Sequence, residues 1–77
     1  MDYGITDRIR ASLVENNFQR EAHEFDSLIR SGTTGGEIVY LVGEYLEKIA
    51  SEEGDLAELI QPCLKEFRDY AKSIGIY

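Results

Sequence analysis

The chain has 77 residues, 43% of them hydrophobic, which is enough for one domain with a small core. Its formal charge of −7 argues against non-specific binding to nucleic acids or to anionic membranes, because both need clustered Lys and Arg. One Cys and one His are too few for an internal disulfide or a structural zinc site. We find no basic region before an N-terminal apolar run, and no run long enough to cross a bilayer, so we expect a reduced, cytoplasmic setting.

The first third of the chain predicts one or two helices. Thr6 is the expected N-cap of a helix that reaches about Glu15, because Ile5, Ile9 and Leu13 recur every four residues. A second apolar stripe starts at Phe18 and lies roughly opposite the first when counted at 100° per residue. A break at the two asparagines, residues 16–17, explains this change of phase, since asparagine tolerates left-handed geometry. The alternative is one long helix over residues 6–31 whose halves face different neighbours.

The segment 33–50 predicts the central helix of the domain. Gly32 is the expected left-handed C′ residue of the preceding helix. Thr34 and Glu37 then form a T-x-x-E capping box at the start of the next one. The apolar arc of this helix is broad enough to need neighbours on more than one side; it comprises Ile38, Val39, Leu41, Val42, Tyr45, Leu46 and Ile49.

A last helix is expected to begin with Asp55 and Glu58, which repeat the cap pattern as D-x-x-E. Pro62 lies within it, but the apolar positions stay in phase from Leu56 to Ile74, which favours one helix with a proline kink over two helices. Gly75 is the expected C′ residue, with Ile76 folding back onto the last turn. The fold class predicted for residues 1–77 is therefore all-α, a single antiparallel bundle of three to four helices with short connections.

No motif in the chain predicts catalysis, a cofactor or a metal. Asp26-Ser27-Leu28 resembles the tripeptide of acyl carrier proteins, whose serine carries phosphopantetheine. In that family the tripeptide opens a helix, whereas here it comes late in one, so Ser27 is interpreted as a solvent-facing helical serine. The glycines of residues 33–36 lack the lysine and the strand of a phosphate-binding loop. His23 is expected on the surface and Cys63 on an apolar face without an activating base.

Acidic residues gather between positions 44 and 58, a segment with a formal charge of −5. Caps account for Asp55 and Glu58, while the other acids of the segment have no local role in the sequence. Tyr40 projects away from the apolar arc on the side of these acids, and an aromatic anchor ringed by polar groups is typical of an interface. The predicted protein-binding residues are Tyr40, Gly43, Glu44, Glu47, Glu52 and Glu53, with Gly43 allowing a partner to approach closely. The competing interpretation is a solvated face that only keeps the protein in solution.

The function expected from these features is binding to a basic protein, without enzyme activity. Size, acidity and helical character together resemble, in general type, the bacterial immunity proteins that inhibit nuclease toxins. That resemblance implies a stoichiometric inhibitor whose carboxylates pair with a basic cleft or occupy sites meant for phosphates. A homodimeric bundle burying Val39, Leu46 and the Ile76-Tyr77 end is the first alternative, and an acyl-carrier-like protein modified at Ser27 is the second.

Overall fold

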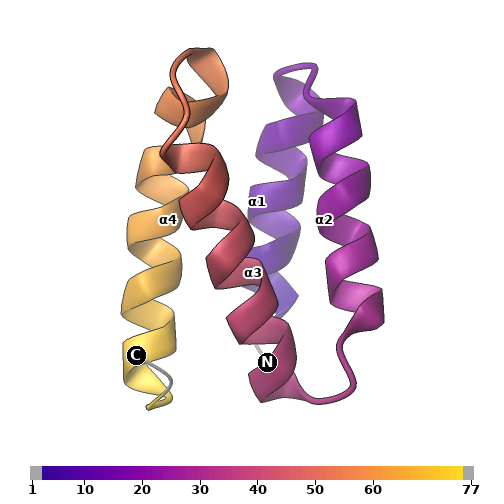
Figure 1. Ribbon diagram of the computed structural model, residues 1–77, viewed down its shortest axis with the longest axis vertical. Helices are drawn as coiled ribbons and strands as arrows, with labels where there is room; N and C mark the ends of the chain where they lie inside the picture. Colours follow the sequence, from indigo (N-terminus) through magenta and orange to yellow (C-terminus); the bar gives the residue numbers. More distant parts are fainter. Residues whose placement is uncertain (1–2, 76–77) are drawn as a thin grey trace.

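Four helices joined by short connections account for most of residues 3–75, the part of the chain that the computed structural model describes (Figure 1). They are α1 (Tyr3–Glu15), α2 (Gln19–Ser31), α3 (Gly35–Ala50) and α4 (Asp55–Ser73). The helices run alternately up and down, and no strand lies in the described range. The prediction of a small antiparallel all-α bundle is confirmed.

The bundle closes because each helix packs against two others. α1 contacts α2 and α4, and α3 contacts the same two helices from the other side. The side chains that fill the space between them are apolar; those with no more than 2% exposure are Ile9, Leu13, Phe25, Val39, Val42, Leu46, Ile60, Phe67 and Ala71. The apolar stripes predicted from the sequence therefore face one common core, except at Ile74, the last predicted position of the final stripe, which is 47% exposed. Two ion pairs at the surface, Arg10 with Asp26 and Arg8 with Glu66, link α1 to α2 and to α4.

The two asparagines do interrupt the first helical segment. Asn17 adopts a φ of 67°, in the left-handed region that asparagine tolerates better than most residues. The next amide, of Phe18, turns back to donate to the Leu13 carbonyl at 2.8 Å. The reversal lets the stripes of α1 and α2 both face the core, and it confirms two helices over one.

The start of α1 differs from the prediction. The helix begins at Tyr3, and Thr6 lies inside it with 1% exposure instead of capping it. Ile5, Ile9 and Leu13 are all buried, so packing of this stripe carries the helix one turn beyond its predicted start.

The link between α2 and α3 combines a correct prediction with a wrong one. The Thr34 hydroxyl accepts the Glu37 amide at 3.1 Å, which confirms this half of the cap, while the Glu37 carboxylate accepts from the Thr33 hydroxyl at 2.9 Å. Gly32 is not left-handed: its φ and ψ are −74° and 139°. It is needed for space, because a Cβ there would clash with Cγ1 of Ile38 and lie 3.3 Å from the Ile38 main chain.

Gly32→Ala is therefore expected to lower the free energy of unfolding by about 1–3 kcal/mol, the usual range for overpacking. The backbone angles of Gly32 suit alanine, so without the clash the same substitution would stabilise the chain by about 0.4–1 kcal/mol through the unfolded state. Urea unfolding followed by circular dichroism shows whether the substitution lowers or raises the free energy of unfolding. Stability that is unchanged or raised would show that the connection relaxes around the added methyl group.

Both ends of α4 are set by glycines. Gly54, at φ 116°, occupies the N-cap position, and Asp55 is the first helical residue and not the predicted cap. Gly75, at φ 81°, donates to the Lys72 carbonyl at 3.1 Å, as expected of a left-handed C′ residue; Ile76 lies outside the described residues. The helix continues across the exposed Pro62, because Ile60 and Leu64 on either side of it are held in the core.

None of the helices within residues 3–75 combines the length and the apolar composition that crossing a bilayer requires.

Candidate functional site

Tyr40 is the most exposed of the large hydrophobic side chains in the described residues, with 59% exposure. It lies on the outer face of α3, one turn before Glu44, which is also exposed. Within residues 3–75 the Glu44 carboxylate has no ion-pair partner within 4.0 Å. This pair of side chains has the arrangement that the sequence predicted for a binding face.

Gly43, predicted on the same face, is buried inside the bundle. It lies on the edge of α3 that also carries Val39 and Glu47, each four residues away. Glu47 pairs with Arg68 of α4, so this edge faces α4. Gly43 is therefore enclosed by the chain's own helices, and the prediction that it lies on the exposed binding face is wrong.

Glu47 has a structural role that the sequence did not show. Nη2 and Nε of Arg68 both donate to its Oε1, at 2.7 and 3.2 Å. Both side chains remain about half exposed, so the ion pair stabilises the fold by no more than about 1 kcal/mol. Glu47 is therefore partly neutralised, and it contributes less to an acidic face than Glu44 does.

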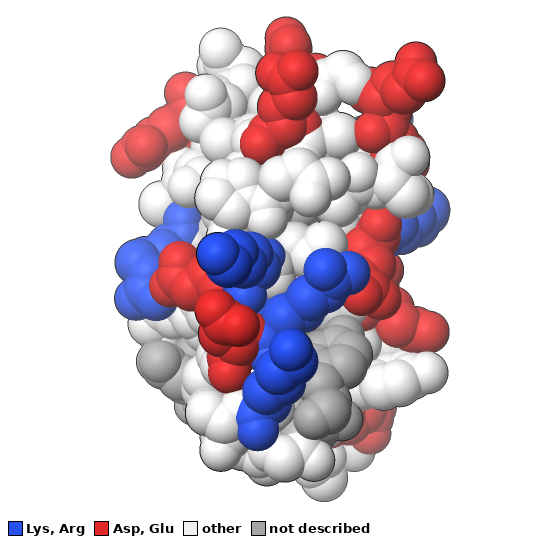
Figure 2. Space-filling model, turned by 90° about the vertical axis from the view of Figure 1, so that its left-hand side faces the viewer, with Lys and Arg blue, Asp and Glu red and all other residues white. Residues whose placement is uncertain are grey.

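The acidic turn between α3 and α4 stays free of such neutralisation. Glu52 and Glu53 are exposed, and neither makes an ion pair with any other described residue. Figure 2 shows acidic side chains at this end of the molecule, whereas Lys and Arg gather lower on the face formed by α4. The charge is thus unevenly distributed, with its negative excess at the end of the bundle where α3 meets α4.

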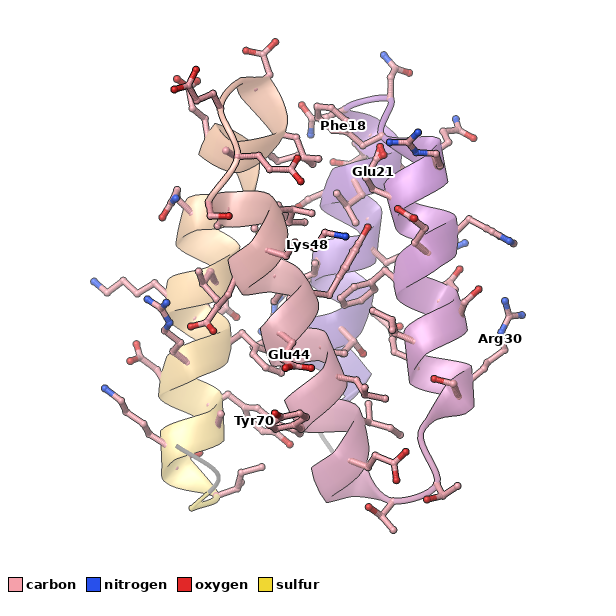
Figure 3. All side chains as sticks on the ribbon, viewed as in Figure 1. Phe18, Glu21, Arg30, Glu44, Lys48 and Tyr70 are labelled. Atoms are coloured by element: carbon pink, nitrogen blue, oxygen red, sulfur yellow. The ribbon has the colours of Figure 1, made fainter. Side chains whose placement is uncertain are left out.

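A pocket of about 190 Å³ opens next to this acidic end, between α2, α3 and the start of α4. Its apolar side chains are Phe18, Ile49 and Leu56; its polar ones are Arg20, Glu21, Glu24, Tyr45, Lys48 and Glu52. Figure 3 shows Phe18 and Glu21 beside the upper part of α2, with Lys48 reaching across from α3. Sequence reasoning missed this pocket. One feature of the sequence could have indicated it: Glu21 is an acid on the apolar stripe of α2, three residues after Phe18 and four before Phe25.

Glu21 is the unusual group of the pocket. Its side chain keeps only 13% exposure, and its Oε2 atom is buried without a hydrogen-bond donor among the described residues. The nearest cation is Nε of Arg20 at 3.6 Å, on a side chain that is itself 86% exposed. Burial of a carboxylate oxygen without a donor costs about 1–3 kcal/mol or more. Glu21 therefore keeps, on a side chain that lines the pocket, an acceptor that no donor of the described residues uses.

Tyr45 forms the wall between α3 and α2. Its hydroxyl donates to Glu24 Oε1 at 3.0 Å, and its ring lies 6.4 Å from the Phe25 ring. Burial of the hydroxyl raises the pKa of Tyr45 well above 10, and the bond to the Glu24 carboxylate adds to the effect. The side chain is thus held neutral and in place through the whole neutral pH range.

The raised pKa of Tyr45 predicts a loss of stability in alkali. Above about pH 10 the tyrosine of the unfolded chain ionises while that of the folded chain keeps its proton, so the unfolded state binds fewer protons and the free energy of unfolding falls. The slope from this group is at most about 1.4 kcal/mol per pH unit, and less because the hydroxyl is partly exposed. In the Tyr45→Phe variant this contribution to the pH dependence of the free energy of unfolding should be absent. Urea unfolding of both proteins between about pH 9 and pH 11 measures the difference; parallel curves would contradict the prediction.

Three further residues with reactive side chains are Ser27, His23 and Cys63. Ser27 and His23 are exposed on α2. Cys63 is half-buried, and burial raises the pKa of its thiol, with a smaller effect from Glu66. Among the described residues no three His, Cys, Asp or Glu side chains are grouped so that they could hold a metal ion.

Comparison with protein-family models, curated proteins and solved structures found no match to the chain.

Proposed function

We propose that this chain is a small acidic protein-binding module, and that its partner is a basic protein. The observation that carries the proposal is Tyr40, which exposes more than half of its surface beside Glu44, a carboxylate without an ion pair among the described residues. A tyrosine offers a large contact area at a low cost in conformational entropy, and such residues, ringed by polar groups, dominate the energy of many interfaces. Among the described residues Tyr40 does not belong to the core cluster of the bundle.

The distribution of charge supports a basic partner. Glu44 on the outer face of α3 and Glu52 and Glu53 at its end are exposed and without ion pairs in the described part of the chain. Carboxylates of one sign speed the encounter with a positively charged surface and repel acidic proteins. Because the chain has a formal charge of −7, nucleic acids and anionic membranes are poor partners for it.

The mechanism of this proposal is stoichiometric neutralisation. Tyr40 inserts into the partner's surface, and the carboxylates pair with a basic cleft or take the places of phosphates. The binding takes place in the cytoplasm and involves no chemical step, so neither a cofactor nor a metal is part of it.

Affinity capture followed by mass spectrometry tests the proposal, with three forms of the full chain as bait. They are the wild type, the face variant Tyr40→Ala/Glu44→Lys, and the control variant Val14→Ala/Glu15→Lys. The control makes the same two kinds of change on α1, where Val14 and Glu15 are exposed. Circular dichroism first establishes that all three proteins fold.

A basic protein that is recovered by the wild type and the control but lost with the face variant would support the proposal, provided that the purified pair forms a complex of fixed stoichiometry. Recovery of the same proteins by all three forms would contradict it. Sedimentation of the wild type alone tests the homodimer. Val39 and Leu46 have no exposed surface, so the dimer interface expected from the sequence is not available at these two residues; Ile76 and Tyr77 lie outside the described range.

A further inference from the structure

We infer that the pocket between α2, α3 and the start of α4 receives an arginine side chain of the basic partner, with the guanidinium directed at Glu21. This inference rests on the proposed function and names the chemical group that the module recognises. Its starting point is the buried Oε2 of Glu21, an acceptor with no hydrogen-bond donor from residues 3–75. A cationic donor that reaches this carboxylate supplies the missing hydrogen bond and adds to the charge compensation from Arg20 Nε, which lies 3.6 Å from Oε2.

The acceptors around the pocket suit a group with several donors. Glu24 and Glu52 line it together with Glu21, so carboxylates come from α2 and from the acidic turn after α3. Oε1 of Glu24 already accepts the Tyr45 hydroxyl at 3.0 Å, which holds this carboxylate in position. A guanidinium presents five N–H donors in a rigid plane and contacts more than one carboxylate at a time, whereas an ammonium is a compact point charge.

The size and the apolar wall of the pocket also fit an arginine. Its volume of about 190 Å³ is below the range of about 300–1,000 Å³ typical of sites for drug-sized ligands and cofactors, so a single long side chain is the matching occupant. The methylene stem of an arginine packs on Ile49 and Leu56. The Phe18 ring offers a face on which a guanidinium can stack.

Two cations of the chain itself, Arg20 and Lys48, also line the pocket. Lys48 makes no ion pair within 4.0 Å among the described residues, and Arg20 is mostly exposed. They reduce the attraction for an incoming cation, and neither of them donates a hydrogen bond to Oε2 of Glu21, although Arg20 forms an ion pair with it at 3.6 Å. Lys48 lies two turns after Tyr40 on α3, so a bound segment that contacts Tyr40 reaches the pocket after about 12 Å along the helix.

A titration of the isotope-labelled full chain, followed by NMR, tests the inference. The probe is Nα-acetyl-L-arginine amide, and the matched control is Nα-acetyl-L-citrulline amide, which has nearly the same shape but no charge. We expect the arginine probe to shift the amide signals of the residues that line the pocket, with an affinity about 10-fold or more above that of the citrulline probe.

Three variants test whether binding of the arginine probe depends on the charges of the pocket. Glu21→Gln is expected to weaken binding of the arginine probe about 10-fold, whereas Glu53→Gln, which removes the same charge from an exposed site at the same end, changes it less than about 2-fold. Lys48→Gln is expected to strengthen it about 2- to 5-fold, because a like charge is removed. Equal binding of the citrulline probe, shifts spread over all surface carboxylates, or equal effects of Glu21→Gln and Glu53→Gln would each overturn the inference.

The capture experiment separates this inference from the proposed function. If Glu21→Gln recovers the basic partner as fully as the wild type does, while the face variant at Tyr40 and Glu44 loses it, the pocket has no part in binding and the proposed function stands. If the arginine probe binds in a Glu21-dependent manner but the wild type captures no basic protein, the pocket's selectivity is supported and its assignment to a protein partner is overturned.

Discussion

Replacing Phe67 by alanine is expected to lower the free energy of unfolding by about 3–5 kcal/mol. The Phe67 side chain has no exposed surface, and its ring lies 6.2 Å from that of Tyr70 in the same helix. Alanine leaves a cavity at the centre of the bundle, which the four helices can close only in part. For a domain of this length the total stability is roughly 4–12 kcal/mol, so this single substitution removes a large share of it. Urea unfolding followed by circular dichroism measures the loss.

Val14→Ala is the matched control for Phe67→Ala. Val14 is 37% exposed on α1, and its replacement is expected to change stability by no more than about 0.5 kcal/mol. If Phe67→Ala does not fold at all, Ile60→Val, which removes one methyl group from another fully buried side chain, is expected to cost about 0.5–1.5 kcal/mol. A change below about 0.5 kcal/mol for Phe67→Ala would contradict the position of this ring in the core.

Tyr40→Ala is expected to weaken binding to the captured basic partner about 30-fold or more, which corresponds to at least about 2 kcal/mol. The substitution removes an exposed ring that makes no contribution to the core, so the stability of the free chain should change by no more than about 0.5 kcal/mol. Most of the loss in affinity should appear as faster dissociation, because interface contacts act mainly on that rate. Surface plasmon resonance with the purified partner measures both rates.

Glu44→Gln provides the contrasting variant for the same interface. An exposed carboxylate acts mainly on the association rate, so this substitution should slow association and reduce its dependence on salt. Val14→Ala, on α1, should change neither rate. If Tyr40→Ala and Val14→Ala leave the affinity equally unchanged, Tyr40 is not the anchor, and the proposed binding face must be abandoned.

The helices themselves could be predicted because their signals are local. The T-x-x-E cap before α3 and the asparagines between α1 and α2 act through hydrogen bonds and steric limits within a few residues. At Pro62, residue preference alone would have predicted the wrong structure. A proline inside a helix favours a break, but the apolar phase on both sides of it predicted one helix, and α4 is continuous.

The boundaries were predicted less well, because a neighbouring element decides them. Thr6 has the chemistry of a cap, yet α1 extends past it. Gly32 and Gly54 look alike in sequence, but Gly32 is extended and close to Ile38, whereas Gly54 takes a positive φ where an added Cβ would meet nothing within 4 Å. Glycine is thus needed at Gly32 for space and at Gly54 for its backbone angles. Only the packing of the folded chain distinguishes these two requirements.

At the candidate site, the outward direction of Tyr40 and Glu44 could be predicted, because the 3.6-residue period places them opposite the apolar arc of α3. The burial of Gly43, the pairing of Glu47 with Arg68 and the pocket lined by Glu21 could be seen only in the folded chain. Periodicity gives directions around one helix axis, whereas burial, ion pairing and cavities depend on which helix lies against each edge. These neighbours are far apart in the chain, and their packing together sets the surroundings of each site residue.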